Sequence, residues 1–288
     1  MVNSTLTLDE PGQPTLDQFT ASDGYPFFFR RFAARGTVHG RIVVLHGIQS
    51  HGGWYPRSCA KLAEAGFEVY FLDRRGSGQN SRQRGDMPGF RRVLDDCAEF
   101  IRALPPDGLP KFLIGISWGG KLAVALPCRH PGLIDGMALI CPGIAARVRP
   151  SLTTQLRIGL ARLFRPTKLF PIPLNDPELF TASVERRQFI RDDPLALRYA
   201  TARLLFGSRA LDIYLRRARK KATIPTLLLL AEKDRIIDNA KTRAFVDKFP
   251  SSDKEVIEYS GAEHTLEFEA EGHPWLEDLV GWFEKRCR

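Results

Sequence analysis

Ser117 lies in the stretch Gly115-Ile-Ser-Trp-Gly119, between an apolar run and an Ala- and Leu-rich segment. The apolar run, residues 111–116, predicts a buried strand, and residues 121–126 predict a helix. Glycine on either side of the serine lets the strand and the helix approach closely at a tight turn. This Gly-x-Ser-x-Gly pattern is the nucleophile elbow, which presents a serine hydroxyl beside the next backbone amide. So short a pattern also recurs as a simple turn, and therefore other residues must support it.

The same residues match a second motif, the phosphate-binding loop, up to its last position. The pattern Gly115-x-x-x-x-Gly120-Lys121 is followed by Leu122, where binding of Mg²⁺ requires Ser or Thr. The bulky Trp118 also lies inside the loop whose amides would surround a phosphate. These two departures disfavour a nucleotide site.

A serine hydroxyl needs a base to remove its proton, and the base needs an acid to orient it. With a nucleophile elbow, the expected chain order is Ser, acid, His. Asp234 follows the apolar strand that ends at Ala231, and His264 follows the strand that ends at Tyr259. Carboxyl ends of strands are where open α/β sheets place their sites. We therefore predict Ser117 as the nucleophile, His264 as the base and Asp234 as the orienting acid.

Other roles for these residues stay open at this point. Asp234 is also compatible with a helix-flanking carboxylate, whereas Asp238 fits the N-cap of the next helix. His264 is also compatible with a loop histidine, in which case His273 is the alternative base. The acidic residues around it suggest a metal site: Glu263, Glu267, Glu269 and Glu271. Their spacing matches no known ligand pattern, and therefore we expect neither a metal nor a cofactor.

The negative oxygen that develops during acyl transfer needs hydrogen-bond donors already in place. The Trp118 amide, directly after the serine, is one candidate. The other is the Ile48 amide, in the loop that follows an earlier buried strand and begins with His46-Gly47. In the simpler interpretation this loop only turns the chain, and His46 and His51 are buried hydrogen-bonding residues. The two interpretations are compatible, because the oxyanion would bind to the amide and not to an imidazole.

Strand and helix patterns alternate along most of the chain, which predicts a parallel, doubly wound sheet with helices on both faces. Residues 17–32 predict an N-terminal hairpin with an Asp-Gly turn, preceded by a loose polar arm. Residues 144–222 break the alternation, because they contain helical segments, prolines and no clear strand. We expect a helical cap at 144–222, inserted into a core of residues 1–143 and 223–288.

The net charge of +9 is concentrated in the expected cap. Residues 144–222 contain 17 Lys or Arg and 6 Asp or Glu, so the rest of the chain is close to neutral. In residues 155–165, Leu, Ile and Phe lie on one helix face and Arg on the other, which favours a lid that covers an acyl chain and contacts an anionic membrane surface. The alternative is a solvated face whose Arg stems cover apolar surface. No recognition motif accompanies the charge, and therefore we expect no nucleic-acid binding.

Composition is that of a soluble globular protein. The chain has 288 residues, of which 43% are hydrophobic and 26% charged, enough for a large core. No apolar run is long enough to span a bilayer, and the N-terminus lacks an export signal, so we expect a cytoplasmic protein with or without peripheral membrane contact. The five cysteines form no close pair and are expected to be reduced core residues.

Together these motifs resemble the monoacylglycerol lipase and lysophospholipase branch of the α/β-hydrolases, the serine-aminopeptidase-like group. The stretches that carry the resemblance are His46–Tyr55, Asp73–Gly78, Gly115–Gly120, Asp234 and His264, and the similarity runs from about Phe27 to the C-terminus. The resemblance implies the α/β-hydrolase fold with an inserted cap and no cofactor. It also implies a Ser117–His264–Asp234 triad with the Ile48 and Trp118 amides as oxyanion hole.

Three residues depart from the pattern of this branch. Trp118 replaces the usual Met, Ala231 replaces a frequent Gly, and Trp54 replaces a common Arg. None of these changes removes a reacting atom, but each is expected to alter the shape of the acyl pocket. Serine at position 117 also argues against the dehalogenase and epoxide-hydrolase relatives, which have a carboxylate there.

The expected activity is hydrolysis of a carboxylic ester with a single acyl chain, through an acyl-enzyme. Two alternatives differ in chemistry. A transferase or peroxidase-like relative would pass the acyl group to an acceptor other than water. A ligand-binding relative would keep the fold without turnover.

Overall fold

The computed structural model of the protein describes residues 13–287, so the predicted N-terminal arm lies largely outside the described residues. Its core is an eight-stranded sheet with the order β1-β2-β4-β3-β5-β6-β9-β10. The strands are β1 (Thr15–Thr20), β2 (Pro26–Phe32), β3 (Gly40–Leu45), β4 (Phe67–Leu72), β5 (Lys111–Ile116), β6 (Gly136–Ile140), β9 (Thr226–Ala231) and β10 (Lys254–Tyr259). The six strands from β4 to β10 in this order pair in parallel. Strands β1 and β2 lie at one edge of the sheet, where β1 pairs with β2 and β2 with β4 in the antiparallel direction. The predicted fold class and the N-terminal hairpin are confirmed.

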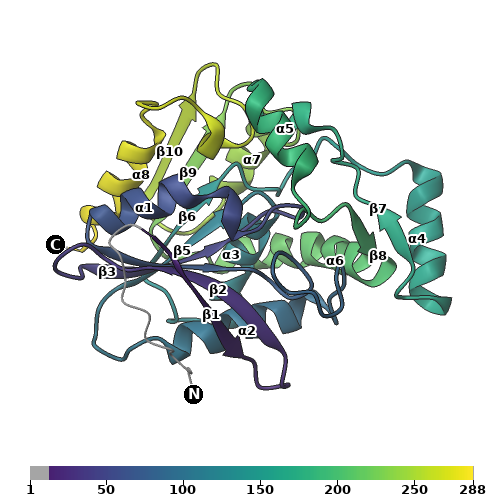
Figure 1. Cartoon of the computed structure of the whole chain (residues 1–288), viewed down its shortest axis with the longest axis horizontal. Coiled ribbons are helices and arrows are strands. Elements are labelled where there is room, and N and C mark those ends of the chain that lie inside the picture. Colours follow the sequence, from purple (N-terminus) through teal and green to yellow (C-terminus); the bar gives the residue numbers. More distant parts are fainter. Residues whose placement is uncertain (1–12, 288) are drawn as a thin grey trace.

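Helices cover both faces of the sheet (Figure 1). α1 (Pro56–Glu64) and α8 (Trp275–Glu284) pack together on one face, and α2 (Phe90–Ala103) and α3 (Trp118–Arg129) pack together on the other. α7 (Asn239–Val246) connects β9 to β10. Strands β3, β4, β6 and β9 are buried along their full length and β5 after its first residue, as their continuous apolar runs predict. Because these strands are parallel, the loops that follow them all lie at the carboxyl ends of the strands.

Between β6 and β9 the chain makes a long excursion. It contains α4 (Leu152–Phe164), β7 (Leu169–Pro171), α5 (Val184–Asp192), β8 (Tyr199–Thr201) and α6 (Ala202–Ala218). Figure 1 shows α4, β7 and β8 at the right-hand side of the molecule, while α6 returns to pack along α3. The expectation that this segment has no strand was wrong, because β7 and β8 form a two-stranded antiparallel ribbon. Strands of three residues are too short to show a period.

Short 3-10 helices complete the described part of the chain. They are η1 (Gly52–Trp54), η2 (Pro177–Leu179), η3 (Arg219–Lys221) and η4 (Leu266–Phe268). Among the helices of residues 13–287, none combines the length and the apolar character needed to cross a membrane.

The turn from β5 into α3 holds Ser117 in an unusual backbone conformation, with φ 50° and ψ −117°. Residues other than glycine rarely adopt this backbone conformation, and therefore the surrounding packing must impose it. A Cβ atom on Gly119 would lie 2.1 Å from the Leu45 carbonyl oxygen, and one on Gly115 would lie 2.6 Å from the Ala123 Cβ. These two glycines let β3, β5 and α3 meet closely enough to fix the turn.

This packing predicts the effect of one added methyl group. Gly119→Ala should lower the free energy of unfolding by about 3 kcal/mol, because the backbone of β3 cannot move aside without disturbing the sheet. Gly159→Ala is the matched control, since Gly159 lies inside α4 with no atom within 4 Å of its added Cβ. That change should raise the free energy of unfolding by about 0.5 to 1 kcal/mol. Urea unfolding measures both, and a Gly119→Ala protein as stable as the parent would contradict the prediction.

Candidate active site

Three side chains that are far apart in the sequence meet at the carboxyl edge of the sheet. The Ser117 Oγ lies 3.0 Å from the His264 Nε2, and the His264 Nδ1 lies 2.6 Å from the Asp234 Oδ2. Ser117 follows β5, Asp234 follows β9, and His264 follows β10. Both contacts are hydrogen bonds, and a base linked in this way to a hydroxyl and a carboxylate can accept the hydroxyl proton.

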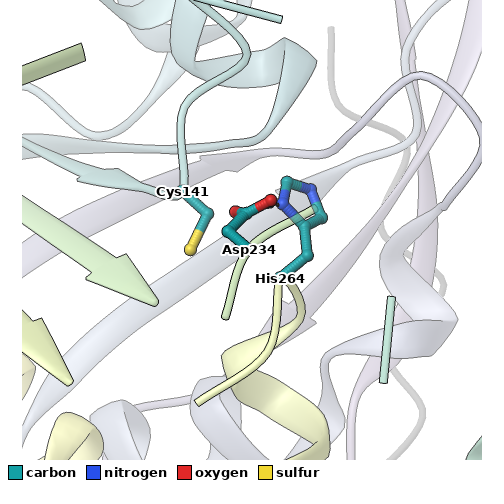
Figure 2. A group of neighbouring side chains, drawn as sticks. All are labelled: Cys141, Asp234 and His264. Carbon is teal, nitrogen blue, oxygen red and sulfur yellow. Dashed lines mark hydrogen bonds and ion pairs between the residues drawn. The ribbon is translucent and has the colours of Figure 1, made fainter. Parts of the chain in front are cut away.

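The Asp234 carboxylate is buried and fixed from two sides. Its Oδ1 accepts hydrogen bonds from the amides of Ile236 and Ile237, at 2.7 and 2.9 Å, which leaves Oδ2 to His264. Figure 2 shows this carboxylate between the imidazole and the Cys141 side chain. Burial raises the pKa of the Cys141 thiol well above its ordinary value, and therefore the thiol stays neutral beside the carboxylate.

Cys141, Asp234 and His264 also have the chemistry of a metal-ligand set. One ligand atom from each lies within 4.8 Å of the others. However, the His264 Nδ1 and the Asp234 Oδ2 are already hydrogen-bonded to each other, so the set does not offer three free ligands. The geometry is that of an oriented base.

The segment that follows His264 is bound to the start of α1. The Glu267 carboxylate accepts hydrogen bonds from the amides of Arg57 and Ser58, at 2.8 and 3.2 Å. The Arg57 guanidinium in turn donates to the carbonyl of Glu269 at 2.8 Å. Because Tyr55, the N-cap of α1, makes no side-chain cap, Glu267 supplies the acceptor that the first amides of this helix need. This contact anchors the segment that carries His264.

Glu267 is the buried acid of this region that responds to pH near neutrality. Burial raises the pKa of Glu267 from its ordinary value of 4.5 to about 7, although the Ser58 and Arg57 donors act in the opposite direction. Between these two values the folded protein keeps a proton that the unfolded chain has released. Folding is therefore destabilised as the pH rises from about 4.5 to about 7.

This pKa predicts a pH-dependent effect of Glu267→Gln. Relative to the parent, the variant should gain stability as the pH rises from 5 to 8, by at most about 3 kcal/mol, because Gln cannot become charged. Thermal unfolding at several pH values measures the difference, and the other titrating groups cancel between the two proteins. Glu277→Gln is the control, since the Glu277 side chain is 70% exposed. A stability difference between Glu267→Gln and the parent that does not change with pH would contradict the prediction.

The loop after β3 runs directly past Ser117. A Cβ atom on Gly47 would lie 3.3 Å from the Ser117 Cβ, a tight contact that glycine avoids. Ile48 follows, and together with Ser117 it lines a cleft at the carboxyl edge of the sheet. The Trp118 amide is the first of α3 and has no acceptor within the helix. The two amides predicted as oxyanion donors are thus placed on the two segments beside the serine.

The structure also places the other residues for which the sequence suggested a role. His273 contacts the Tyr259 ring, at 5.1 Å between centroids, and Asp238 caps α7 as predicted. The prediction that His46 and His51 are buried and hydrogen-bonded is confirmed. Lys121 is bound to Asp212 of α6 at 2.5 Å, so it is not free to hold a phosphate.

The excursion between β6 and β9 contributes to the cleft and is bonded to the loops that hold the site. Leu174 and Phe180 line the cleft together with Ile116, and the Phe180 ring centroid lies 5.9 Å from that of the His264 ring. The Thr265 amide donates to the Phe180 carbonyl at 3.0 Å. This segment and the carboxyl end of the sheet therefore line the cleft together.

Two of the three residues that depart from the family pattern bond this same segment. The Trp54 Nε1 donates to Asp193 at 2.6 Å, and the Trp118 Nε1 donates to Ser208 at 2.8 Å. The His51 Nε2 also lies 3.0 Å from the Asp193 carboxylate. Burial alone would raise the pKa of Asp193, but the hydrogen bonds from His51 and Trp54 lower it to about 2. Asp193 therefore stays charged at this contact.

Comparison with known proteins identifies the family. Residues 36–271 match the family described as Hydrolase_4, serine aminopeptidase S33. The chain belongs to this family. Monoglyceride lipase of Homo sapiens is similar, at 30% identity over 257 residues that cover 87% of this chain and 84% of the relative. Lysophospholipase L2 of Escherichia coli is 28% identical, covering 88% of this chain and 82% of the relative. The predicted resemblance is confirmed.

A solved structure has the same fold. A soluble variant of monoglyceride lipase from Saccharomyces cerevisiae, in complex with a substrate analog, aligns with a TM-score of 0.84. The alignment covers 99% of this chain and 97% of that one at 22% sequence identity. At this identity the likeness bears on the fold and not on the substrate.

Sequence reasoning missed three residues that shape the site. Asp193 comes from a charged stretch and Arg74 from the Gly-rich loop after β4. Arg74 is buried and the Asp193 side chain is 6% exposed, and each contacts the loop after β3. Glu267 was weighed only as one acid among several around His264. A glutamate three residues after the base, close to a helix that lacks its own cap, was the available signal.

Proposed function

We propose that the protein is a serine hydrolase that cleaves carboxylic esters of a single acyl chain, such as a monoacylglycerol or a lysophospholipid. The observation that carries this proposal is the pair of hydrogen bonds joining Ser117, His264 and Asp234, at 3.0 and 2.6 Å. Nucleophilic ester cleavage needs this connection of hydroxyl, base and acid. The relatives named monoglyceride lipase and lysophospholipase support the substrate class.

The proposed reaction has two halves. In the first, the His264 Nε2 takes the Ser117 proton while Oγ attacks the ester carbonyl, and Asp234 stabilises the imidazolium. The amides of Ile48 and Trp118 bind the oxyanion, and His264 then gives the proton to the departing alcohol. In the second half, His264 activates a water that attacks the acyl-enzyme and releases the fatty acid. Apolar side chains at the cleft suit the acyl chain.

Active-site labelling tests the proposal. A fluorophosphonate should label the parent protein at Ser117, and Ser117→Ala should abolish labelling. Ser117→Ala and His264→Ala should each lower kcat for a monoacylglycerol by at least about 10⁴, because neither leaves a reactive alkoxide. His273→Ala is the matched control and should retain labelling and turnover, since His273 lies against Tyr259. Labelling that persists in His264→Ala at the parent rate would contradict the assigned base.

Products distinguish hydrolysis from the alternatives. Water as acceptor gives the free fatty acid even when an alcohol or peroxide is added in excess. A transferase would give mainly the new ester or the peracid instead. Failure of the parent protein to react with a fluorophosphonate would indicate a ligand-binding relative. A chain-length series of p-nitrophenyl esters, beside monoacylglycerol and lysophospholipid, defines the preferred acyl chain.

We also propose that α4 rests on the surface of an anionic lipid bilayer. One face of α4 carries large apolar side chains that are at least 61% exposed: Leu152, Leu156, Leu160, Leu163 and Phe164. These positions recur at intervals of three and four and therefore form one stripe. Arg157, Arg162 and Arg165 lie in or directly after the same helix. An exposed apolar stripe beside arginines is the pattern of a helix that lies at a membrane interface.

Vesicle sedimentation tests this surface. The parent protein should pellet with phosphatidylcholine vesicles that contain phosphatidylglycerol, and less without the anionic lipid or at high salt. Leu156→Ser combined with Leu160→Ser should reduce pelleting strongly, while hydrolysis of a soluble short-chain ester stays unchanged. Leu16→Ser is the control, because Leu16 is 49% exposed on β1, away from α4. Equal pelleting with and without anionic lipid would contradict the role of the charge.

A further inference from the structure

Arg74 is a buried cation, and the carboxylate of the adjacent Asp73 is hydrogen-bonded to other groups. Arg74 follows β4 and is 6% exposed. Both oxygens of the adjacent Asp73 accept hydrogen bonds elsewhere, from the Arg30 guanidinium and from the amides of Gly52 and Gln79. The Arg74 Nε is buried without a hydrogen-bond partner among the described residues. Burying a charged guanidinium without a carboxylate partner costs free energy, and an apolar side chain of similar size would fill this position without that cost.

The hydrogen bonds of the Arg74 guanidinium go to the loop that carries the proposed oxyanion donor Ile48. One terminal nitrogen donates to the carbonyl oxygen of Ile48 through a short hydrogen bond, and to that of Gly47 at 3.4 Å. The guanidinium carbon lies 4.9 Å from the centre of the Trp118 ring. Burial lowers the pKa of Arg74 to about 9, which leaves the group charged at neutral pH.

The Gly47 carbonyl and the Ile48 amide are two ends of one peptide group. In a trans peptide these two ends point in opposite directions, so Arg74 lies behind the amide that would face the substrate. The Gly47 oxygen also lies 2.7 Å from the His46 Nδ1. Because the His46 Nε2 accepts from the Arg74 amide at 3.0 Å, the imidazole proton is on Nδ1 and is donated to Gly47. Donors at a carbonyl polarise the peptide and strengthen its N–H as a donor.

We propose that Arg74 is a positioning residue. Its guanidinium binds the Ile48 carbonyl through a short hydrogen bond and the Gly47 carbonyl more weakly, and so it holds the Ile48 amide between them in place as an oxyanion donor. This inference rests on the proposed ester hydrolysis. The effect of Arg74 is greatest when negative charge develops on the substrate oxygen. Loss of Arg74 should therefore change kcat much more than KM.

Arg74→Met is the direct test. Methionine keeps the length of the side chain and its contact with the Trp118 ring but removes the charge and the donors. With active sites counted by the amplitude of fluorophosphonate labelling, kcat for a p-nitrophenyl ester should fall about ten- to a hundredfold, part of the effect of losing a whole oxyanion donor. KM should stay within about threefold. Arg74→Lys, which keeps the charge, should recover part of the lost kcat.

Two inhibitors separate this role from a structural one. An alkyl trifluoromethyl ketone forms an oxyanion on Ser117, whereas an alkyl glycerol ether of the same chain length binds without one. In Arg74→Met the affinity for the ketone should fall by the same factor as kcat/KM, and that for the ether should stay within about twofold. Should Arg74→Met not fold, the same measurements on Arg74→Lys and Arg74→Gln give the comparison.

Arg75→Met is the matched control, because Arg75 is also buried but is paired with Asp96 and Asp23 at 2.7 and 3.0 Å. It should lose stability and keep kcat per labelled site. Unchanged kcat in Arg74→Met, or equal weakening of ketone and ether, would overturn the proposal for Arg74. Absence of labelling and turnover in the parent protein would instead overturn the proposed function.

Discussion

The close meeting of β3, β5 and α3 is the constraint on which the site depends. Ser117 occupies a backbone conformation that residues other than glycine rarely adopt. Gly115 and Gly119 allow it, because a Cβ atom at either position would clash where the three elements meet. The same contact brings the loop after β3 against the serine. The candidate nucleophile and the candidate oxyanion donors are therefore positioned by the same packing of β3, β5 and α3.

Polar contacts then connect this packed centre to the excursion between β6 and β9. Trp54 and His51 bind Asp193, Trp118 binds Ser208, and Lys121 binds Asp212. All the core partners in these contacts come from the loop after β3 or from the start of α3. The segment that lines the cleft is thus bonded to the backbone that carries the candidate amides, so that a displacement of one would displace the other. Two tryptophans that depart from the family pattern are part of this connection.

The sequence predicted the parts of this arrangement that repeat or that follow a spacing rule. Buried strands show continuous apolar runs, and a serine between two glycines marks a tight turn, so the sheet and the positions of Ser117, Asp234 and His264 could be derived. The contacts of Arg74, Glu267 and Asp193 could not be derived from the sequence. Each depends on a partner from a distant part of the chain, and in the sequence each resembles a charged residue on the surface. The strands β7 and β8 were missed because three residues are too few to show a period.

The most direct test of the central claim is a crystal structure of the protein after reaction with a long-chain alkyl phosphonate. The phosphorus should be bonded to the Ser117 Oγ, with the phosphoryl oxygen accepting hydrogen bonds from the Ile48 and Trp118 amides and the His264 Nε2 near the leaving-group position. An adduct on another residue, or a phosphoryl oxygen that faces away from both amides, would contradict it.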